Sequence, residues 1–215
     1  MRAFIRRLHL PAPTRWLLTV AGLEAVYLLL QILDAPLYAA ARAWDVADHS
    51  LLSLIKNFGA LSVWVAVAAG LVLYDWQRLK NGWRRIVGRG TQLLGGALFA
   101  GLAAEILKLF IRRERSQEWF AALPNYREWV GAWWENNDLG MPSSHAATAF
   151  GAAIMLAKLF PAGAAWWYGL ATACAVSRVV AQAHTPTEVY VGAVVAWIVA
   201  WAIENAELRI KNFGV

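Results

Sequence analysis

Two histidines and a carboxylate lie near basic residues in the second half of the chain. His184 precedes Glu188 by four positions and follows Arg178 by six. A carboxylate that accepts the proton of one imidazole nitrogen leaves the other nitrogen free to act as a nucleophile. His145 can donate a proton to a leaving oxygen. These residue types predict nucleophilic catalysis on a charged substrate.

A second basic segment runs from Lys108 to Arg115. If a helix continues through it, Lys108, Arg112 and Arg115 recur at i, i+4 and i+7 and project from one face. Such a face can neutralise a phosphate from several directions. Basic residues at the end of an apolar run also commonly anchor a helix among lipid headgroups, which is the alternative explanation.

The third segment, Pro142–His145, stands directly before an Ala-rich apolar run. Ser143 or Ser144 can cap a helix there, and the free backbone N–H groups of its first turn then attract anions. The alternative is simple helix capping beside an uninvolved histidine.

The residues after His184 also have two interpretations. Thr185, Pro186 and Glu188 fit the cap, first and third positions of a helix, so Glu188 can belong to a capping box. It can equally orient His184, and a shared carboxylate allows both. Arg178 ends an apolar run and needs a partner, which is Glu188, a carbonyl or a substrate phosphate.

Together the three segments provide what phosphoryl transfer requires. Cations and N–H groups bind the equatorial oxygens, an oriented nucleophile attacks, and an acid protonates the leaving group.

The elements that position these residues are predicted to be membrane helices. The 215 residues are 60% hydrophobic and 16% charged, and their mean hydropathy is +0.44. We expect an all-α bundle of six transmembrane helices forming a single domain over residues 1–215, since the apolar runs approach the ~20 residues needed to cross a bilayer. The runs are Trp16–Leu33, Gly59–Trp76, Thr91–Ile111, His145–Phe160, Ala164–Ala181 and Pro186–Ala206. The net charge of +6 does not indicate nucleic acid, because the basic residues lie between these runs.

Charge also predicts the orientation. With an uncleaved first span and both termini in the cytoplasm, twelve Lys and Arg residues lie inside and eight outside. The outer cations gather around Lys108–Arg115 and Arg178, where function explains them better than topology. We expect a bacterial inner-membrane protein with its site facing the periplasm.

The longest connection, Arg112–Pro142, interleaves aromatic and charged residues between spans three and four. This composition predicts a periplasmic interfacial helix, serving either as a structural belt or as a lid over a headgroup site.

The three segments resemble the signature of the type 2 phosphatidic acid phosphatase family, the lipid phosphate phosphatase superfamily. Its pattern is K-x6-R-P, P-S-G-H and S-R-x5-H-x3-D. Here it reads Lys108-x6-Arg115-Ser116, Pro142-Ser143-Ser144-His145 and Ser177-Arg178-x5-His184-x3-Glu188. The order and the internal spacings match.

The resemblance implies a metal-independent lipid phosphatase without cofactors. His184 would attack phosphorus to give a phosphohistidine, Glu188 would orient it, and His145 would protonate the departing oxygen. The substrate phosphate would be held by several side chains, namely Lys108, Arg115, Ser143, Ser144 and Arg178.

Three positions depart from the family pattern. Ser116 replaces Pro, Ser144 replaces Gly beside the expected phosphate, and Glu188 replaces Asp. The extra methylene of Glu188 must be absorbed if its bond to His184 is to keep its geometry, and a poor fit would leave a catalytically weak protein.

Other functions remain open. A lipid phosphotransferase would need the same residues. A serine hydrolase using Ser143 or Ser144 lacks a G-x-S-x-G elbow, and adjacent cations oppose a metal on His145, His184 and Glu188. A non-enzymatic transporter or scaffold would use Glu24, Glu105 and Arg178 as structural pairs. The lipid, whether undecaprenyl diphosphate, phosphatidylglycerophosphate, phosphatidic acid or a lipid A phosphate, and the oligomeric state do not follow from the residues.

Overall fold

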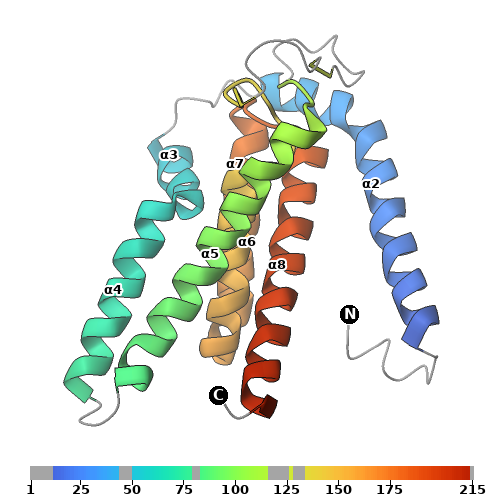
Figure 1. Cartoon of the computed structure of the whole chain (residues 1–215). Helices are drawn as coiled ribbons and strands as arrows, with labels where there is room; N and C mark the ends of the chain where they lie inside the picture. The colour runs from blue at the N-terminus through green and yellow to red at the C-terminus, as the bar shows by residue number, and fades with distance from the viewer. Residues whose placement is uncertain (1–11, 44–49, 79–82, 116–125, 128–133, 214–215) are drawn as a thin grey trace.

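A computed structural model describes residues 12–43, 50–78, 83–115, 126–127 and 134–213 (Figure 1). Six long helices lie where the six apolar runs predict them, so the all-α fold class is confirmed. The elements are α2 (Ala12–Ala43), α3 (Ser50–Lys56), η1 (Asn57–Gly59), α4 (Leu61–Arg78), α5 (Trp83–Ile111), α6 (Ser144–Leu159), η2 (Pro161–Gly163), α7 (Ala164–Val180) and α8 (Pro186–Phe213).

The helices are those of a multi-pass membrane protein. Three of them, α2, α5 and α8, are long and apolar enough to cross a bilayer, and the pair α3–α4, bent by 65°, can form a fourth span. Helices α6 and α7 have 16 and 17 residues, which is short for a full crossing. The count of six spans therefore stays a prediction.

Helix α6 lies at the centre of the bundle, packed against α5, α7 and α8. Its sequence is rich in Ala and Gly, so the neighbouring backbones approach closely. At the crossing with α5, a Cβ on Gly151 would lie 2.8 Å from the Cβ of Ala100 and closer still to the carbonyl of Gly96. This tight core fixes the start of α6 relative to the end of α5.

Helix α2 stands apart from the bundle along much of its length (Figure 1). The 18-residue apolar stretch of α2 has no buried residue, as expected of a surface that faces lipid. Polar contacts attach it to the ends of other helices. Tyr190 donates a hydrogen bond to the carbonyl of Leu23 at 2.9 Å, and Tyr38 donates one to the carbonyl of Gln182 at 3.2 Å.

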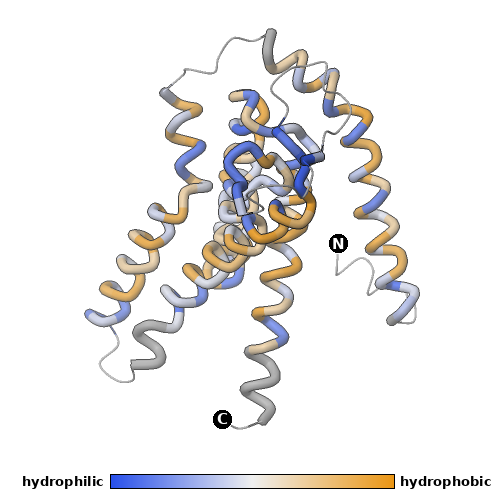
Figure 2. The backbone as a smooth tube through the Cα atoms, turned by 45° about the horizontal axis from the view of Figure 1, so that its top comes forward, coloured by the Kyte–Doolittle hydropathy of each residue, from blue (hydrophilic) through white to orange (hydrophobic). Residues whose placement is uncertain are grey.

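Hydrophilic residues gather in the connections at one end of the bundle, whereas the helices are mostly apolar (Figure 2). This end holds the end of α5 and the starts of α6 and α8, and the start of α2 and the end of α8 lie at the opposite end (Figure 1). The predicted interfacial helix falls largely on residues 116–125 and 128–133, outside the described residues.

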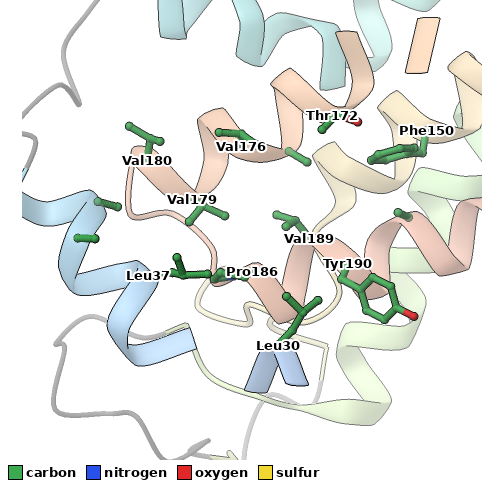
Figure 3. Close-up of a pocket in the computed structure, with 14 residues that line it drawn as sticks. Leu30, Leu37, Phe150, Thr172, Val176, Val179, Val180, Pro186, Val189 and Tyr190 are labelled. Atoms are coloured by element: carbon green, nitrogen blue, oxygen red, sulfur yellow. The ribbon is translucent and has the colours of Figure 1, made fainter. Parts of the chain in front are cut away.

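An apolar cavity of about 500 Å³ lies between α2, α7 and α8, next to Phe150 of α6 (Figure 3). Thr172 and Tyr190 are the only lining residues with polar side-chain atoms. Since no cation lines it, this cavity suits hydrocarbon and is not where a phosphate would bind.

Candidate active site

The predicted helical face of Lys108, Arg112 and Arg115 does not form, because α5 ends at Ile111. Arg112 adopts a left-handed backbone conformation with φ of 54°, which stops the helix. Its Nε donates to the carbonyl of Arg127 at 3.0 Å. The condition for a shared helical face, a helix that continues to Arg115, is therefore not met; the helix ends at Ile111, where the predicted third span also ends, and Arg112 contacts the connection.

Beyond the helix, the chain runs beside the segment that precedes α6. The N–H of Arg115 donates to the carbonyl of Asp138 at 2.7 Å, and the N–H of Gly140 donates to the carbonyl of Arg113 at 2.9 Å. These bonds bring the second basic residue of the first motif to the beginning of the second motif.

Arg113, which the motif comparison did not select, is buried at this point with 3% of its surface exposed. Its guanidinium donates to Asp34 of α2 at 3.1 Å, and its Nε lies 3.9 Å from Oε1 of Glu188. Asp34 also accepts a hydrogen bond from the N–H of Thr187 at 2.8 Å. Asp34 is a carboxylate at the end of an apolar run, and that unusual position is the sequence signal for it.

The start of α6 forms as predicted. Ser143 is the capping residue, and its side chain accepts a hydrogen bond from the N–H of Ala146. The N–H of Ser143 itself donates to the backbone carbonyl of Glu188 at 3.0 Å. Helices α6 and α8 thus begin side by side, with the nucleophile candidate next to the proposed anion site.

Lys108 reaches the start of α6 from α5. Its Nζ lies 2.8 Å from Glu105, three residues earlier on the same helix, and 3.3 Å from the hydroxyl of Ser144. Asn136 donates to the other oxygen of Glu105 at 2.5 Å. The ammonium is therefore held beside Ser144, the position where the family has glycine.

His184 and Glu188 form the predicted pair. Nδ1 of His184 lies 2.8 Å from Oε2 of Glu188, and the two side chains are 2% and 0% exposed. The same Oε2 accepts the N–H of Thr185 at 3.2 Å, and the hydroxyl of Thr185 accepts the N–H of Glu188 at 3.4 Å. One carboxylate therefore completes the capping box and orients the histidine, so both interpretations of Glu188 hold.

The connection from α7 to α8 holds His184 in place. Its N–H donates to the carbonyl of Arg178 at 3.2 Å, and the preceding Gln182 adopts a left-handed conformation with φ of 54°. Burial lowers the pKa of His184, the Glu188 carboxylate raises it, and the charges of Arg115 and Arg178 lower it again. The net direction is downward, so the ring is neutral at pH 7. A proton on Nδ1, facing the carboxylate, leaves Nε2 with a free lone pair.

Arg115 and Arg178 present their guanidinium groups to this site. The Nε of each is buried and has no hydrogen-bond acceptor, and neither forms an ion pair within the described part of the chain. The two cations also repel one another. Of the partners predicted for Arg178, Glu188 is thus taken by His184 and Arg113, and a bound anion fits best.

His145 lies in the first turn of α6, where the positive charges of Arg178 and Lys108 reach it. Gly59 of η1 approaches its other side, since a Cβ there would lie 2.8 Å from the Cβ of His145. All eight residues predicted from the sequence thus lie at one end of the bundle. Among the described residues, no three His, Cys, Asp or Glu side chains gather as metal ligands would.

Two comparisons with known proteins give matches. A sequence model of the PAP2 superfamily matches residues 89–209. The fold is similar to the crystal structure of a transmembrane PAP2 type phosphatidylglycerolphosphate phosphatase from Bacillus subtilis, with a TM-score of 0.58 and 20% sequence identity. The similarity covers 90% of this chain and 98% of that one. No curated protein sequence matches.

The family match spans more than half of the chain and includes all three motifs. The chain belongs to the PAP2 superfamily.

Proposed function

We propose that this protein is a lipid phosphate phosphatase that hydrolyses a phosphomonoester or diphosphate of a membrane lipid. The observation that carries the proposal is that the buried Nε atoms of Arg115 and Arg178 have no acceptor in the described part of the chain, while both guanidinium charges act on His184. Cations beside an oriented nucleophile suit an incoming phosphate rather than a carboxylic ester.

In the first step, Nε2 of His184 attacks phosphorus. A nitrogen–phosphorus bond forms while the bond from phosphorus to the lipid oxygen breaks. Glu188 stabilises the positive charge that develops on the imidazole through its contact with Nδ1. Protonated His145 gives its proton to the departing oxygen, and the negative substrate compensates the positive charge of that histidine.

In the second step, water attacks the phosphohistidine. Neutral His145 takes the proton of the water, the nitrogen–phosphorus bond breaks, and inorganic phosphate leaves. Lys108, Arg115 and Arg178 bind the equatorial oxygens in both transition states, together with Ser143, Ser144 and the N–H groups at the start of α6. No step in this sequence requires a metal ion.

The position of the site supports a substrate at the membrane surface. The polar connections lie at one end of apolar helices, where a lipid headgroup meets its hydrocarbon chain (Figure 2). We assign this end to the periplasmic face of a bacterial inner membrane and both termini to the cytoplasm, on the bias of Lys and Arg in the sequence.

The experiment is release of inorganic phosphate from a panel of lipid phosphates in detergent with EDTA, comparing wild type with His184→Ala. We expect release by wild type and none above background by the variant. The panel contains phosphatidic acid, phosphatidylglycerophosphate, undecaprenyl diphosphate and a lipid A phosphate. Loss of release on chelation would contradict the metal-free mechanism.

No release from any lipid by folded wild type would contradict hydrolysis. A parallel reaction with a second lipid as acceptor then tests for a lipid phosphotransferase. Such an enzyme would transfer the phosphate to the acceptor lipid and release no inorganic phosphate. Equal release by His184→Ala would remove His184 from the mechanism.

A further inference from the structure

Glu188 reaches His184 with a side chain one methylene longer than the family's Asp. His184 lies just before α8, and the hydrogen bonds between Thr185 and Glu188 fix the start of that helix, so a longer side chain at position 188 must fold back or occupy additional space. In this structure the carboxylate extends toward Gly140, in the segment that precedes α6.

A side chain at position 140 would occupy the space of this carboxylate. A Cβ on Gly140 would lie 2.7 Å from Cδ and 2.8 Å from Oε2 of Glu188, and closer still to Oε1. Real Cβ atoms essentially never approach so closely. The backbone of Gly140 does not adopt a left-handed conformation, so alanine would fit its φ, and the three atoms nearest to its Cβ all belong to Glu188.

Neither the segment around Gly140 nor the carboxylate of Glu188 can move without breaking a hydrogen bond of the site. The segment around Gly140 is buried and held by the hydrogen bond from its N–H to the carbonyl of Arg113, whose side chain is paired with Asp34. The carboxylate of Glu188 is held by His184 and the N–H of Thr185. The flexible end of Glu188 would move first, and moving it breaks the bond to Nδ1 of His184.

We propose that Gly140 is a positioning residue that makes room for Glu188, so that glycine at 140 and glutamate at 188 form a matched pair. This inference rests on the proposed function, because the position it sets is that of the nucleophile His184. It explains how the chain accepts the departure from Asp: the space for the additional methylene lies at position 140.

The test is a double-mutant cycle of Gly140→Ala and Glu188→Asp, read as kcat/KM for phosphate release. Gly140→Ala alone should lower activity by about a hundredfold, since misplacing a catalytic group by ~1 Å costs that much. In the Glu188→Asp background the shorter carboxylate withdraws by about 1.5 Å, one carbon–carbon bond. The same alanine should then cost less than about threefold, because its methyl group fills the space released.

The matched control is Gly169→Ala. Gly169 lies in α7 and a Cβ there meets nothing within 4 Å, so activity should not change. A second measurement reports the geometry directly. The chain contains four histidines, so 15N-histidine NMR with His184→Ala for assignment resolves the His184 ring. Gly140→Ala should abolish the Nδ1-protonated signature, and Glu188→Asp added to it should restore that signature.

The matched pair would be overturned if Gly140→Ala lowered kcat/KM equally in the wild-type and the Glu188→Asp backgrounds. Full activity of the single variant Gly140→Ala would also overturn it. If wild type releases phosphate from no lipid, the proposed function fails instead, and the NMR comparison still decides whether Gly140 positions Glu188. An unchanged His184 signature in Gly140→Ala would then contradict the inference.

Discussion

The basic side chains at the two ends of the bundle differ in their ion pairing. At the end where α4 leads into α5, Arg89 pairs with the buried Asp75, and Lys158 pairs with Glu204 at 2.8 Å. At the other end, Arg115 and Arg178 have buried N–H groups with no acceptor and lie close enough to repel one another.

The difference separates structural charges from functional ones. A cation that stabilises a fold is paired, because an unpaired charge away from water is costly. Two unpaired guanidinium groups beside His184 therefore indicate a site whose anion comes from the substrate. This end also holds a structural pair, since Arg113 is bound by Asp34. Lys108 is paired with Glu105 and also lies beside Ser144. Arg115 and Arg178 differ from both in having no ion pair within the described part of the chain.

Removing both unpaired cations should have the largest effect. Each donor to a developing negative charge contributes about 10²- to 10³-fold, so Arg115→Ala with Arg178→Ala should lower kcat/KM by at least about 10⁴-fold. Thermal stability should stay unchanged or rise, because two mutually repelling charges are removed. The measurement is phosphate release together with Tm.

Arg89→Ala is the matched control at the opposite end. It leaves the buried carboxylate of Asp75 without its partner, at a cost of about 1–3 kcal/mol in unfolding free energy. Tm should fall while kcat/KM at permissive temperature stays near wild type. If Arg178→Ala instead lowered Tm and spared activity, the contrast between the two ends would be lost.

Glu188→Gln tests the pair that is both structural and functional. The amide retains hydrogen-bonding capacity for the capping box but no longer stabilises a positive imidazole, so kcat should fall by about 10³-fold with little change in KM. A variant within tenfold of wild type would show that the carboxylate serves only to start α8.

Asp34→Asn should have a moderate effect. The amide oxygen can still accept the N–H of Thr187, whereas the ion pair with Arg113 is lost. We expect about a tenfold loss of activity, because Arg113 is then free to shift toward Glu188, 3.9 Å away. Arg113→Lys should cause a similar loss of activity. If both variants had wild-type kinetics, the ion pair between Asp34 and Arg113 would serve only to attach α2 to the bundle.

The smallest expected effect is on the pH dependence of stability. The folded state lowers the pKa of His184, chiefly through burial, so below the ordinary value of about 6.5 the unfolded chain binds more protons. Stability is therefore complete above pH 6.5 and falls as the pH drops below it. Tm measured from pH 7.5 to 5 should fall more steeply for wild type than for His184→Ala, and parallel curves would contradict the lowered pKa.

The helices and the principal contacts of the motifs could be predicted because local rules determine them. Apolar runs locate the helices, Ser143 caps α6, and the capping box of Thr185 and Glu188 brings the carboxylate to His184 just before α8. Each of these follows from neighbours within a few positions along the chain.

The errors concern contacts between distant segments. The end of α5 at Ile111 agrees with the predicted span, but the left-handed conformation of Arg112, which removes the following basic residues from the helical face, was not predicted. The binding of Arg113 by Asp34 joins residues 79 positions apart. The space that the longer side chain of Glu188 needs is next to Gly140, and the connection between α5 and α6 must fold before Gly140 lies beside Glu188.

The hydrogen bond from Ser143 to the carbonyl of Glu188 also has a consequence for synthesis of the chain. The start of α6 emerges from the ribosome well before His184, and the two are joined only when α8 is in place. A partly synthesised chain therefore carries the cations without the nucleophile. Under the proposed function, the newly made protein becomes reactive toward lipid phosphates only with its last helix.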